Sequence, residues 1–267
     1  MSNNLLKGKK GIIFGALNED SIAWKVAERA HEEGAEFILS NAPVALRMGQ
    51  LDELAKATNS EIVPADVTST EDLENLFKIA EDKYGKLDFI LHSIGMSINV
   101  RKKIHYTESN YDFYHKAMDI SAISFHRIMK IAKEKDIMNE WGSILALSFI
   151  AAQLAIPGYN DMSDAKALLE SIARTFGYYY GVDKKVRVNT ISQSPTKTTA
   201  GGGIKGFDSL YGYADKNSPL GNAPAEDCAN YCIMMFSDLT KYVTMQNLFH
   251  DGGFSTTGLT EEIMGDI

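Results

Sequence analysis

The sequence predicts a single-domain α/β fold in which a doubly wound, parallel sheet of seven strands carries helices on both faces. Short apolar runs of strand length alternate with longer stretches of helical periodicity along the whole chain. The 267 residues are 45% hydrophobic, which suits one large core better than two small ones. No repeat, low-complexity tract or linker divides residues 1–267, so we expect one domain.

Charge and composition narrow the range of functions. The 27 basic and 35 acidic residues leave a net charge of −8, so the electrostatic footprint of a nucleic-acid-binding protein is absent. The first ten residues lack the apolar core of a signal peptide, and no run approaches the roughly 18 apolar residues of a membrane span, so we expect a cytoplasmic protein with no membrane partner. Cys228 and Cys232 lie in an apolar helical pattern without a nearby histidine, which favours buried thiols over a metal site.

The first strand and the first helix flank a glycine turn. The apolar run Lys10–Gly15 stops at Gly15, and a helical pattern begins at Ser21. A strand, a glycine turn and a serine-capped helix N-terminus form a pyrophosphate site, because free amide N–H groups and the helix dipole converge there. The fingerprint G-x-G-x-x-G is incomplete, since Leu17 and Asp20 stand at its later glycine positions. An ordinary connection between strand and helix is therefore equally consistent with this turn.

The second strand, Ala35–Ser40, ends at Asn41. In dinucleotide-binding folds this position meets the adenosine ribose, where an acid selects NAD and a nearby arginine admits the 2′-phosphate of NADP. Asn41 is neither of these, and Arg47 follows only some residues later. Both NADH and NADPH therefore stay open, with NADH favoured because no basic residue directly follows the strand.

The third strand, Glu61–Ala65, delivers Asp66 and Val67 to the carboxyl edge of the sheet, where ligands bind in open parallel sheets. There Asp66 has two interpretations. Its carboxylate can accept a hydrogen bond from an adenine amino group, or it can form an Asx turn before the helix that starts near Ser69.

The fourth strand, Leu87–Leu91, is followed by His92, Ser93, Ile94 and Gly95. Gly95 lets the backbone approach a ribose or a nicotinamide, and Ile94 would pack against the nicotinamide ring. We expect His92 to be an edge histidine with a structural role.

A strand, a short connection and a helix make up the most informative stretch, Ser143–Glu170. The strand Ile144–Leu147 leads to Gly158, after which we expect a helix that carries both Tyr159 and Lys166. Seven steps of about 100° place the two side chains within roughly 20° of each other on one helical face. The phenol can donate a hydrogen bond to developing negative charge, and the ammonium can hold a hydroxylated ligand and favour the ionised phenol. A tyrosine at a core edge beside a solvated lysine is the alternative.

The remaining elements complete the α/β alternation. A long helix is predicted over Asp112–Lys135, most of it core and part of it suited to packing against a symmetry mate. Strands are predicted at Lys185–Ile191 and Met245–Phe249, with a helix at Ala225–Phe236 between them.

A polar loop follows the sixth strand, at about residues 193–215. Pro195 fixes a turn, Thr196 and Thr198 offer hydroxyl groups, and Gly201–Gly203 confer flexibility. A flexible polar loop at the carboxyl edge of a sheet is suited to act as a substrate lid, and a plain surface connection is the alternative.

Several motifs together resemble the bacterial enoyl-acyl-carrier-protein reductases of the short-chain dehydrogenase/reductase superfamily. The resemblance covers essentially the whole chain, and the spacing of six residues between Tyr159 and Lys166 is its most specific part, because most of that superfamily has three. Met162 occupies the position that a tyrosine would take in the shorter motif. The other matching motifs are GALNEDSIAW, HSIG, VRVNTISQSPTKT, FSDLT and HDGGFS.

This resemblance implies a Rossmann fold and a reaction. Hydride would pass from NADH, or NADPH, to C3 of a trans-2-enoyl thioester in fatty-acid elongation, with acyl carrier protein as the partner that carries the enoyl chain and a homotetramer as the assembly. The alternatives are a related reductase acting on a carbonyl or hydroxyl group, and a non-catalytic NAD(P)-binding protein.

The resemblance also implies roles for individual residues. Tyr159 and Lys166 would be catalytic, with Tyr159 donating to the thioester carbonyl and Lys166 holding the nicotinamide ribose. The expected cofactor-binding residues are Gly15, Ser21, Ile22, Asn41, Asp66, Val67, Ser93, Ile94, Gly95, Lys166, Pro195, Thr196 and Thr198. The expected substrate-binding residues are Phe149, Tyr159, Met162, Ala200, Ile204 and Phe207. Two departures are that Phe149 stands where many relatives have a second tyrosine, and Lys25 where a glycine is common.

Overall fold

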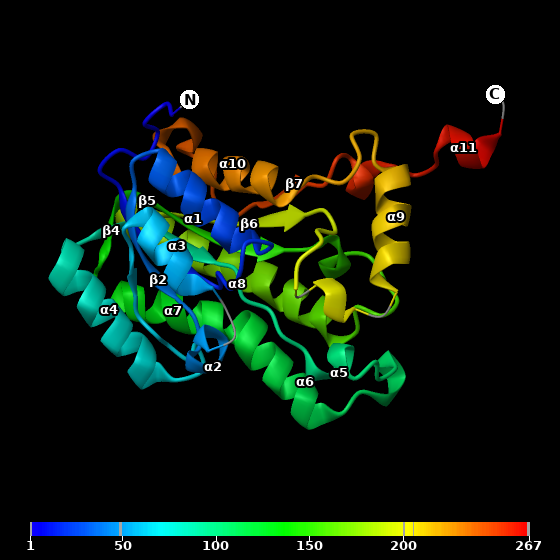
Figure 1. Ribbon diagram of the computed structural model, residues 1–267, viewed down its shortest axis with the longest axis horizontal. Helices are drawn as coiled ribbons and strands as arrows, with labels where there is room; N and C mark the ends of the chain where they lie inside the picture. The colour runs from blue at the N-terminus through cyan, green and yellow to red at the C-terminus, as the bar shows by residue number, and fades with distance from the viewer. Residues whose placement is uncertain (1, 48–49, 200, 205, 266–267) are drawn as a thin grey trace.

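The computed structural model describes residues 2–47, 50–199, 201–204 and 206–265, which form one seven-stranded sheet between two layers of helices (Figure 1). The strand order is β3-β2-β1-β4-β5-β6-β7, and every neighbouring pair is parallel. The chain therefore starts in the middle of the sheet and winds outward in both directions, as predicted. The strands are β1 Lys10–Phe14, β2 Glu36–Ser40, β3 Glu61–Ile62, β4 Leu87–His92, β5 Met138–Ser148, β6 Arg187–Gln193 and β7 Asn247–His250.

The helices divide into two layers because successive strand residues point to opposite faces of the sheet. In β1, Ile12 and Phe14 join the core under α4, α7 and α8, while Ile13 joins the core under α1, α3 and α10. Since both faces are covered, the strands read as nearly continuous apolar runs. The helices are α1 Ile22–Glu32, α2 Pro43–Leu46, α3 Leu51–Thr58, α4 Thr70–Tyr84, α5 Ile98–Arg101, α6 Tyr111–Met118, α7 Ser124–Glu134, α8 Asp161–Lys184, α9 Phe207–Asn217, α10 Ala225–Phe236 and α11 Glu261–Met264.

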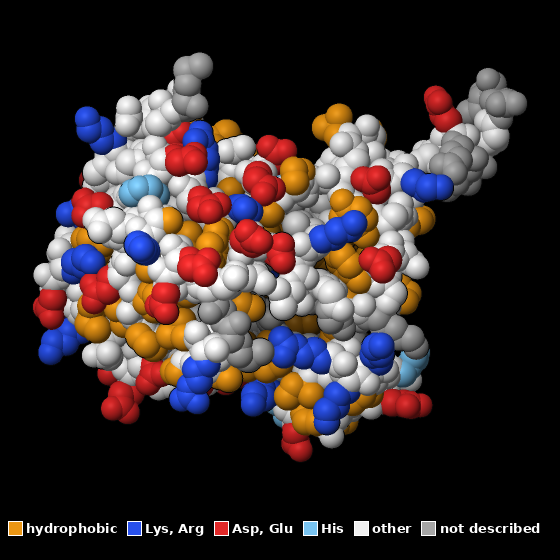
Figure 2. Space-filling model, viewed as in Figure 1, with side chains coloured by type: hydrophobic (Ala, Val, Ile, Leu, Met, Phe, Trp, Pro, Cys, Tyr) orange, Lys and Arg blue, Asp and Glu red, His pale blue; other side chains and the backbone are white. Residues whose placement is uncertain are grey.

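Two side-chain properties expected from composition are present. Cys228 and Cys232 are free, buried thiols in the core between α10 and the sheet. On the face seen in Figure 2, acidic and basic side chains are interspersed rather than gathered into one basic field. No helix among the described residues is both long enough and apolar enough to cross a membrane.

The third strand is shorter than predicted. It ends at Ile62 rather than Ala65, because Pro64 has no N–H group to continue a regular ladder. The amides of Val63 and Ala65 still donate to the carbonyls of Leu39 and Asn41, so the chain runs alongside β2 beyond its last regular pair. A proline is tolerated there because β3 is an edge strand.

The helix predicted over Asp112–Lys135 is interrupted. Between α6 and α7, residues Asp119–Ile123 form a π-helical turn. Within this turn the hydroxyl of Ser121 accepts a hydrogen bond from the amide of Met96 at 3.0 Å and donates to its carbonyl at 3.2 Å. The prediction of one continuous helix was therefore wrong, because one extra residue displaces the downstream apolar positions by only a single place.

The loop predicted at residues 193–215 is partly helical. A short 3₁₀ turn lies at Gly201–Gly203, and α9 begins at Phe207. Figure 1 shows α9 beyond the carboxyl ends of β5 and β6, so this segment lies where it can border a site at that edge.

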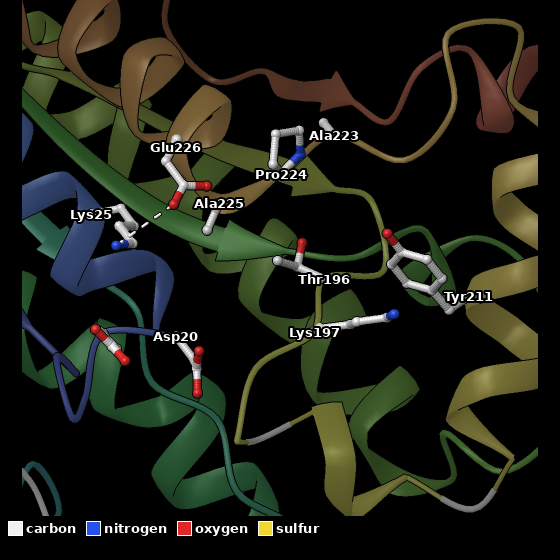
Figure 3. Close-up of a pocket in the computed structure, with 10 residues that line it drawn as sticks. Asp20, Lys25, Thr196, Lys197, Tyr211, Ala223, Pro224, Ala225 and Glu226 are labelled. Carbon is white, nitrogen blue, oxygen red and sulfur yellow. Dashed lines mark ion pairs between the residues drawn. The ribbon is translucent and has the colours of Figure 1, made fainter.

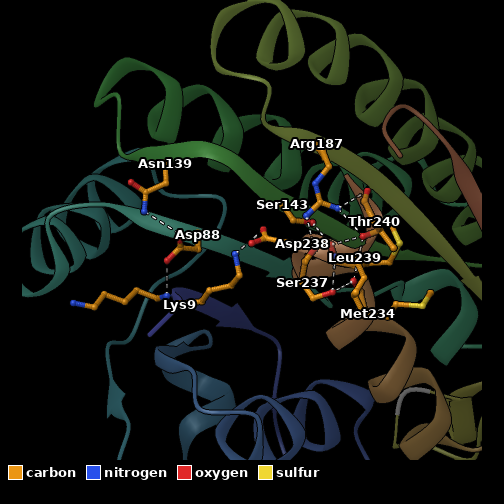
Figure 4. A network of polar contacts seen from close by, with 12 residues as sticks. Lys9, Asp88, Asn139, Ser143, Arg187, Met234, Ser237, Asp238, Leu239 and Thr240 are labelled. Carbon is orange, nitrogen blue, oxygen red and sulfur yellow. Dashed lines mark hydrogen bonds and ion pairs between the residues drawn. The ribbon is translucent and has the colours of Figure 1, made fainter. Parts of the chain in front are cut away.

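Polar contacts tie the opposite, amino-terminal edge of the sheet together (Figure 4). Arg187, at the start of β6, is only 2% exposed and donates to the carbonyls of Ser237 and Thr240. Burial lowers the pKa of this guanidinium, with the charge of Asp238 opposing the shift. Asp238 in turn pairs with Lys9 at 3.1 Å. This network joins the end of α10 to the sheet and leaves the carboxyl edge as the place for a ligand.

Candidate active site

The glycine turn after β1 exists because a side chain has no room there. Gly15 has φ +97°, and a Cβ atom on it would lie 2.0 Å from the carbonyl oxygen of Ser93. The ends of β1 and β4 therefore meet in direct backbone contact, and the amide of Ser93 donates to the carbonyl of Phe14. The turn expected from the sequence thus brings Gly15 and Ser93 to one point on the carboxyl edge.

The N-terminus of α1 has no side-chain cap. Ser21 is the N-cap residue, but its hydroxyl donates to the carbonyl of Asn18 at 2.6 Å and accepts from the amide of Leu17 at 3.2 Å. The prediction of a serine-capped helix was therefore wrong, since Ser21 stabilises the preceding loop instead. The first amide groups of α1, beginning at Ile22, are left without a capping side chain, which suits an anionic ligand.

At the end of β2, the side chain of Asn41 makes hydrogen bonds within its own loop. Its side-chain amide donates to the carbonyl of Ala16 at 2.9 Å, and its side-chain oxygen accepts from the amide of Ala42 at 2.8 Å. The residue thus shapes the connection next to the glycine turn and brings no carboxylate to the ribose position. Ser40, directly before it, has a buried hydroxyl without a partner among the described residues.

Asp66 forms an Asx turn, which is one of the two roles predicted for it. One carboxylate oxygen accepts from both the amide and the hydroxyl of Thr68, at 2.9 and 2.7 Å. The cap of α4 is Ser69, whose hydroxyl accepts from the amide of Asp72. Val67 is buried beside this turn.

The turn after β4 lies against α8. A Cβ atom on Gly95 would lie 3.2 Å from the terminal methyl group of Met162 and 3.9 Å from the ammonium of Lys166. Ile94 packs against the core on the same side of the sheet. Three predicted site residues, Gly95, Met162 and Lys166, are therefore neighbours in space.

Lys166 is buried, with 7% of its surface exposed, and its ammonium donates to the carbonyl of Leu147 at 2.7 Å. Burial lowers its pKa to about 8, and the carboxylate of Glu170 opposes that shift. Glu170 is itself buried and accepts a hydrogen bond from the hydroxyl of Ser148 at 2.7 Å. The lysine is thus fixed by the end of β5 and held near a compensating charge.

Tyr159 does not lie on the helix, contrary to the prediction. Gly158 and Asn160 have φ +88° and +53°, and a residue with positive φ cannot continue a right-handed helix, so α8 begins at Asp161. The shared helical face proposed for Tyr159 and Lys166 is therefore wrong. Lys166 itself lies in the second turn of α8, as expected.

The end of β5 brings Tyr159 and Lys166 into one site instead. The Tyr159 ring packs against Phe149 with 4.9 Å between ring centroids, and Phe149 lies two residues after Leu147, which binds Lys166. The Tyr159 hydroxyl makes no hydrogen bond within the described ranges. Burial raises the pKa of this phenol, so it is a neutral donor, and the expected ionising effect of Lys166 does not prevail.

Residues of the loop after β6 line a cavity of about 270 Å³ next to the glycine turn (Figure 3). In it, Lys197 lies 4.7 Å from the centre of the Tyr211 ring, and Lys25 pairs with Glu226 at 3.6 Å. Thr196 also lines this cavity, and its hydroxyl donates to the carbonyl of Ser194 at 2.9 Å. Lys25, at the position where the family resemblance implies a glycine, therefore forms an ion pair.

The other predicted loop residues fall into three groups. Pro195 is buried at the base of the loop, and the Thr198 hydroxyl accepts from the amide of Gly201. Ile204 and Phe207 are half-buried at the start of α9. Ala200 lies outside the described residues.

Comparison with known proteins decides the family. The family model described as Enoyl-(Acyl carrier protein) reductase matches residues 15–255. The chain belongs to the enoyl-acyl-carrier-protein reductase family. It is 34% identical to enoyl-[acyl-carrier-protein] reductase [NADH] 2 of Rhizobium meliloti, over 96% of this chain and 95% of the relative. A Rickettsia bellii reductase is 34% identical over 99% and 100% of the two chains.

Solved structures agree with this assignment. The crystal structure of a FabI-NADH complex from Alistipes finegoldii has a TM-score of 0.97 and 61% identity, covering 99% of this chain and 94% of that chain. The Aquifex aeolicus reductase has a TM-score of 0.89 and 33% identity, covering 96% and 100%. The expected Rossmann fold, reductase family, enoyl-reducing activity and NADH cofactor are confirmed.

The site of this reductase fits a bound dinucleotide by its own geometry. The uncapped amides of α1 offer donors for a pyrophosphate. Gly15 lets the ends of β1 and β4 pack in contact at the same edge, and Gly95 lies beside the Lys166 ammonium. Two buried oxygens at this edge, on Asn18 and Ser40, have no partner among the described residues and are available to a ligand.

Some residues of the reductase site were not found from its sequence. Leu210 of α9 and Phe254 pack against the Phe149 cluster that holds Tyr159, although both lie far from it in sequence. Glu170 lies four residues after Lys166, a spacing that gains meaning only from the burial of both side chains in the structure. The pair Gly158 and Asn160 did carry a signal, since these two residue types tolerate positive φ best.

Proposed function

We propose that this reductase transfers hydride to C3 of a trans-2-enoyl thioester carried on acyl carrier protein, with Tyr159 and Lys166 as the two residues that act directly. The observation that carries the proposal is that the end of β5 holds both groups. Leu147 binds the Lys166 ammonium, and Phe149 packs against the Tyr159 ring. When bound, NADH supplies the hydride.

Tyr159 stabilises the charge that develops on the substrate. As hydride reaches C3, electrons move to the thioester carbonyl oxygen and an enolate forms. A neutral phenol with no internal hydrogen bond among the described residues is free to donate to that oxygen. A preorganised donor of this kind contributes about 3–4 kcal/mol to stabilising a transition state. Protonation at C2 then completes the reduction.

Lys166 holds the cofactor rather than the substrate. Its ammonium, anchored on Leu147 and lying beside Gly95, retains two hydrogens for the ribose hydroxyls of the nicotinamide nucleotide. The nearby carboxylate of Glu170 favours the charged form of Lys166, which is the form that can donate.

The remaining cofactor contacts follow the elements at the carboxyl edge. We assign the pyrophosphate to the turn and the helix N-terminus at Gly15, Ser21 and Ile22, and the nicotinamide to the turn after β4. The adenosine end is assigned to Asn41, Val67 and Asp66, whose Asx turn uses one carboxylate oxygen and leaves the other for an adenine amino group. The residues assigned to the nicotinamide end are Ser93, Ile94, Gly95, Pro195, Thr196 and Thr198.

The acyl chain is assigned to the apolar surface around Tyr159. Phe149, Met162, Ile204 and Phe207 supply side chains from three segments, namely the end of β5, α8 and the start of α9, and Ala200 is assigned to the same pocket from the sequence alone. Because Phe149 has no hydroxyl group, Tyr159 is the sole phenol proposed to bind the carbonyl.

A homotetramer is part of the proposal. Tyr178, Tyr179 and Val182 on α8 are 57%, 57% and 73% exposed, and Phe249 on the edge strand β7 is 40% exposed. Apolar side chains on a long helix and on an unpaired strand edge are suited to association between copies. A cytoplasmic location belongs to the same proposal.

The test uses purified chain, a short trans-2-enoyl thioester and NADH, with loss of NADH absorbance as the readout. We expect turnover, and a fall in kcat of about 100- to 1000-fold in Tyr159→Phe. Turnover of a 3-ketoacyl thioester in place of the enoyl substrate would indicate a carbonyl reductase. Cofactor binding without any turnover would indicate a non-catalytic binding protein.

A further inference from the structure

We infer that Asn160 is a positioning residue that fixes the direction of the Tyr159 hydroxyl. The inference rests on the catalytic role proposed for Tyr159. Asn160 is the single residue between this tyrosine and the first residue of α8, so its backbone angles set how the tyrosine leaves the helix. Three further observations support the role.

The backbone of Asn160 is strained. Its φ of +53° and ψ of −136° lie near a region that is freely accessible only to glycine. Such a conformation is unfavourable for a residue with a side chain, so the surrounding contacts must enforce it. The side chain is almost fully buried, with 7% exposed.

The side chain of Asn160 does not cap the helix that it precedes. An N-cap asparagine accepts a hydrogen bond from an amide in the first turn of its own helix, which stabilises the helix. Asn160 is the N-cap of α8 and makes no such bond. Its amide nitrogen instead donates to the carbonyl of Ile104 at 2.6 Å, and its oxygen accepts from the hydroxyl of Ser109 at 3.0 Å.

The contacts of Asn160 lead to the segment that also borders the nicotinamide position. The next residue, Asp161, is fully buried and accepts hydrogen bonds from Ser97 and from Asn99, the latter at 2.7 Å. Residues 97–109 therefore bind the start of α8 through hydrogen bonds at two consecutive positions, Asn160 and Asp161. Since this segment starts two residues after Gly95, which is assigned to the nicotinamide end, it fixes Tyr159 relative to the place proposed for hydride transfer.

The decisive variant is Asn160→Gly, which permits the same backbone angles but removes both side-chain bonds. We expect kcat to fall about 10- to 100-fold, because a small misplacement of a reacting group has effects of this size. We expect the KM for NADH to change less than about twofold and the melting temperature to stay close to that of the parent protein, since glycine relieves the strain. Ser109→Ala, which removes one of the two bonds, should show a smaller fall in kcat.

Asn59→Gly is the matched control. Asn59 also has a positive φ, +51°, but it is exposed at the end of α3, far from Tyr159 in the sequence, and its side chain makes no hydrogen bond within the described ranges. This variant should keep the parent kcat.

A double variant separates positioning from general damage. If Asn160 acts through the Tyr159 hydroxyl, Tyr159→Phe combined with Asn160→Gly should be no slower than Tyr159→Phe alone. Losses that multiply, or a parent kcat in Asn160→Gly, would overturn the inference. A parent kcat in Tyr159→Phe would instead remove the proposed role of Tyr159, so the two failures are distinguishable.

Discussion

The Lys166 ammonium donates a hydrogen bond to the carbonyl oxygen of Leu147 over 2.7 Å, which ties α8 to the end of β5. This bond fixes a buried charge at the carboxyl edge of the sheet. It also means that the lysine is oriented before any ligand arrives, so that little ordering is left to be done on binding.

Removing that ammonium should weaken cofactor binding. In Lys166→Ala we expect the Kd for NADH to rise about 10- to 100-fold, since a hydrogen bond to a charged group contributes about 1.5–3 kcal/mol. The measurement is a titration followed by NADH fluorescence. Lys184→Ala, near the end of the same helix, should leave the Kd unchanged. Equal affinities for Lys166→Ala and the parent protein would remove the ribose role.

Cofactor binding should depend on pH above neutrality. Burial lowers the pKa of Lys166 to about 8, so the ammonium is present below that pH and is lost as pH rises through it, and the Kd for NADH should rise accordingly. The other charged or titratable groups near it are Glu170 and His92. Burial lowers the pKa of His92 to about 3, so this imidazole stays neutral across the range.

Glu170→Gln provides the matched variant for this titration. Because the Glu170 carboxylate opposes the shift, its removal should move the rise in Kd to lower pH while leaving the Kd at pH 6 nearly unchanged. Identical pH profiles for the two proteins would show that Glu170 does not sustain the charge of Lys166.

Two glycines with similar backbone angles should respond very differently to alanine. Gly15 and Gly8 have φ +97° and +76°, but a Cβ on Gly15 would lie 2.0 Å from the Ser93 carbonyl whereas nothing lies within 4 Å at Gly8. Gly8→Ala should cost about 1–2 kcal/mol of unfolding free energy, from backbone strain alone. Gly15→Ala should cost several kcal/mol, because the ends of β1 and β4 must separate. Urea denaturation measures both, and equal costs would contradict the close contact.

Gly95→Ala should affect cofactor binding more than stability. The added methyl group would lie 3.2 Å from the end of the Met162 side chain, which can move aside, and 3.9 Å from the Lys166 ammonium. We expect the KM for NADH to rise while the unfolding free energy changes by less than about 1 kcal/mol. The control is Gly181→Ala in α8, which has open space around it and should leave this KM unchanged.

The sheet was predictable because its signals are local. Buried parallel strands read as apolar runs, and Gly15, which follows the first of them, has a positive φ that glycine tolerates best. The alternation of strands and helices then leaves few topologies, and the sheet is parallel and doubly wound, as predicted.

The placement of Tyr159 was not predictable from helical periodicity. Its spacing from Lys166 is compatible with a shared face, yet the positive φ angles at Gly158 and Asn160 delay the start of that helix to Asp161, two residues after the tyrosine. The side chain of Asn160 is bound by Ile104 and Ser109, which lie 56 and 51 residues earlier in the chain. Contacts between residues so far apart in the chain leave no periodic pattern in the sequence.

The π-helical turn at Asp119–Ile123 constrains how the gene for this protein can lengthen or shorten. The turn holds one residue more than an ordinary helical hydrogen-bond ladder accommodates, so deleting one codon there would regularise the helix locally. Because the wide turn already absorbs the extra residue, α7 would keep nearly the same face toward the sheet, but a regular turn would shift Ser121 out of its two hydrogen bonds with Met96. Length changes in this stretch should therefore be excluded by the loss of these contacts, even though a sequence comparison would score the loss of one residue as minor.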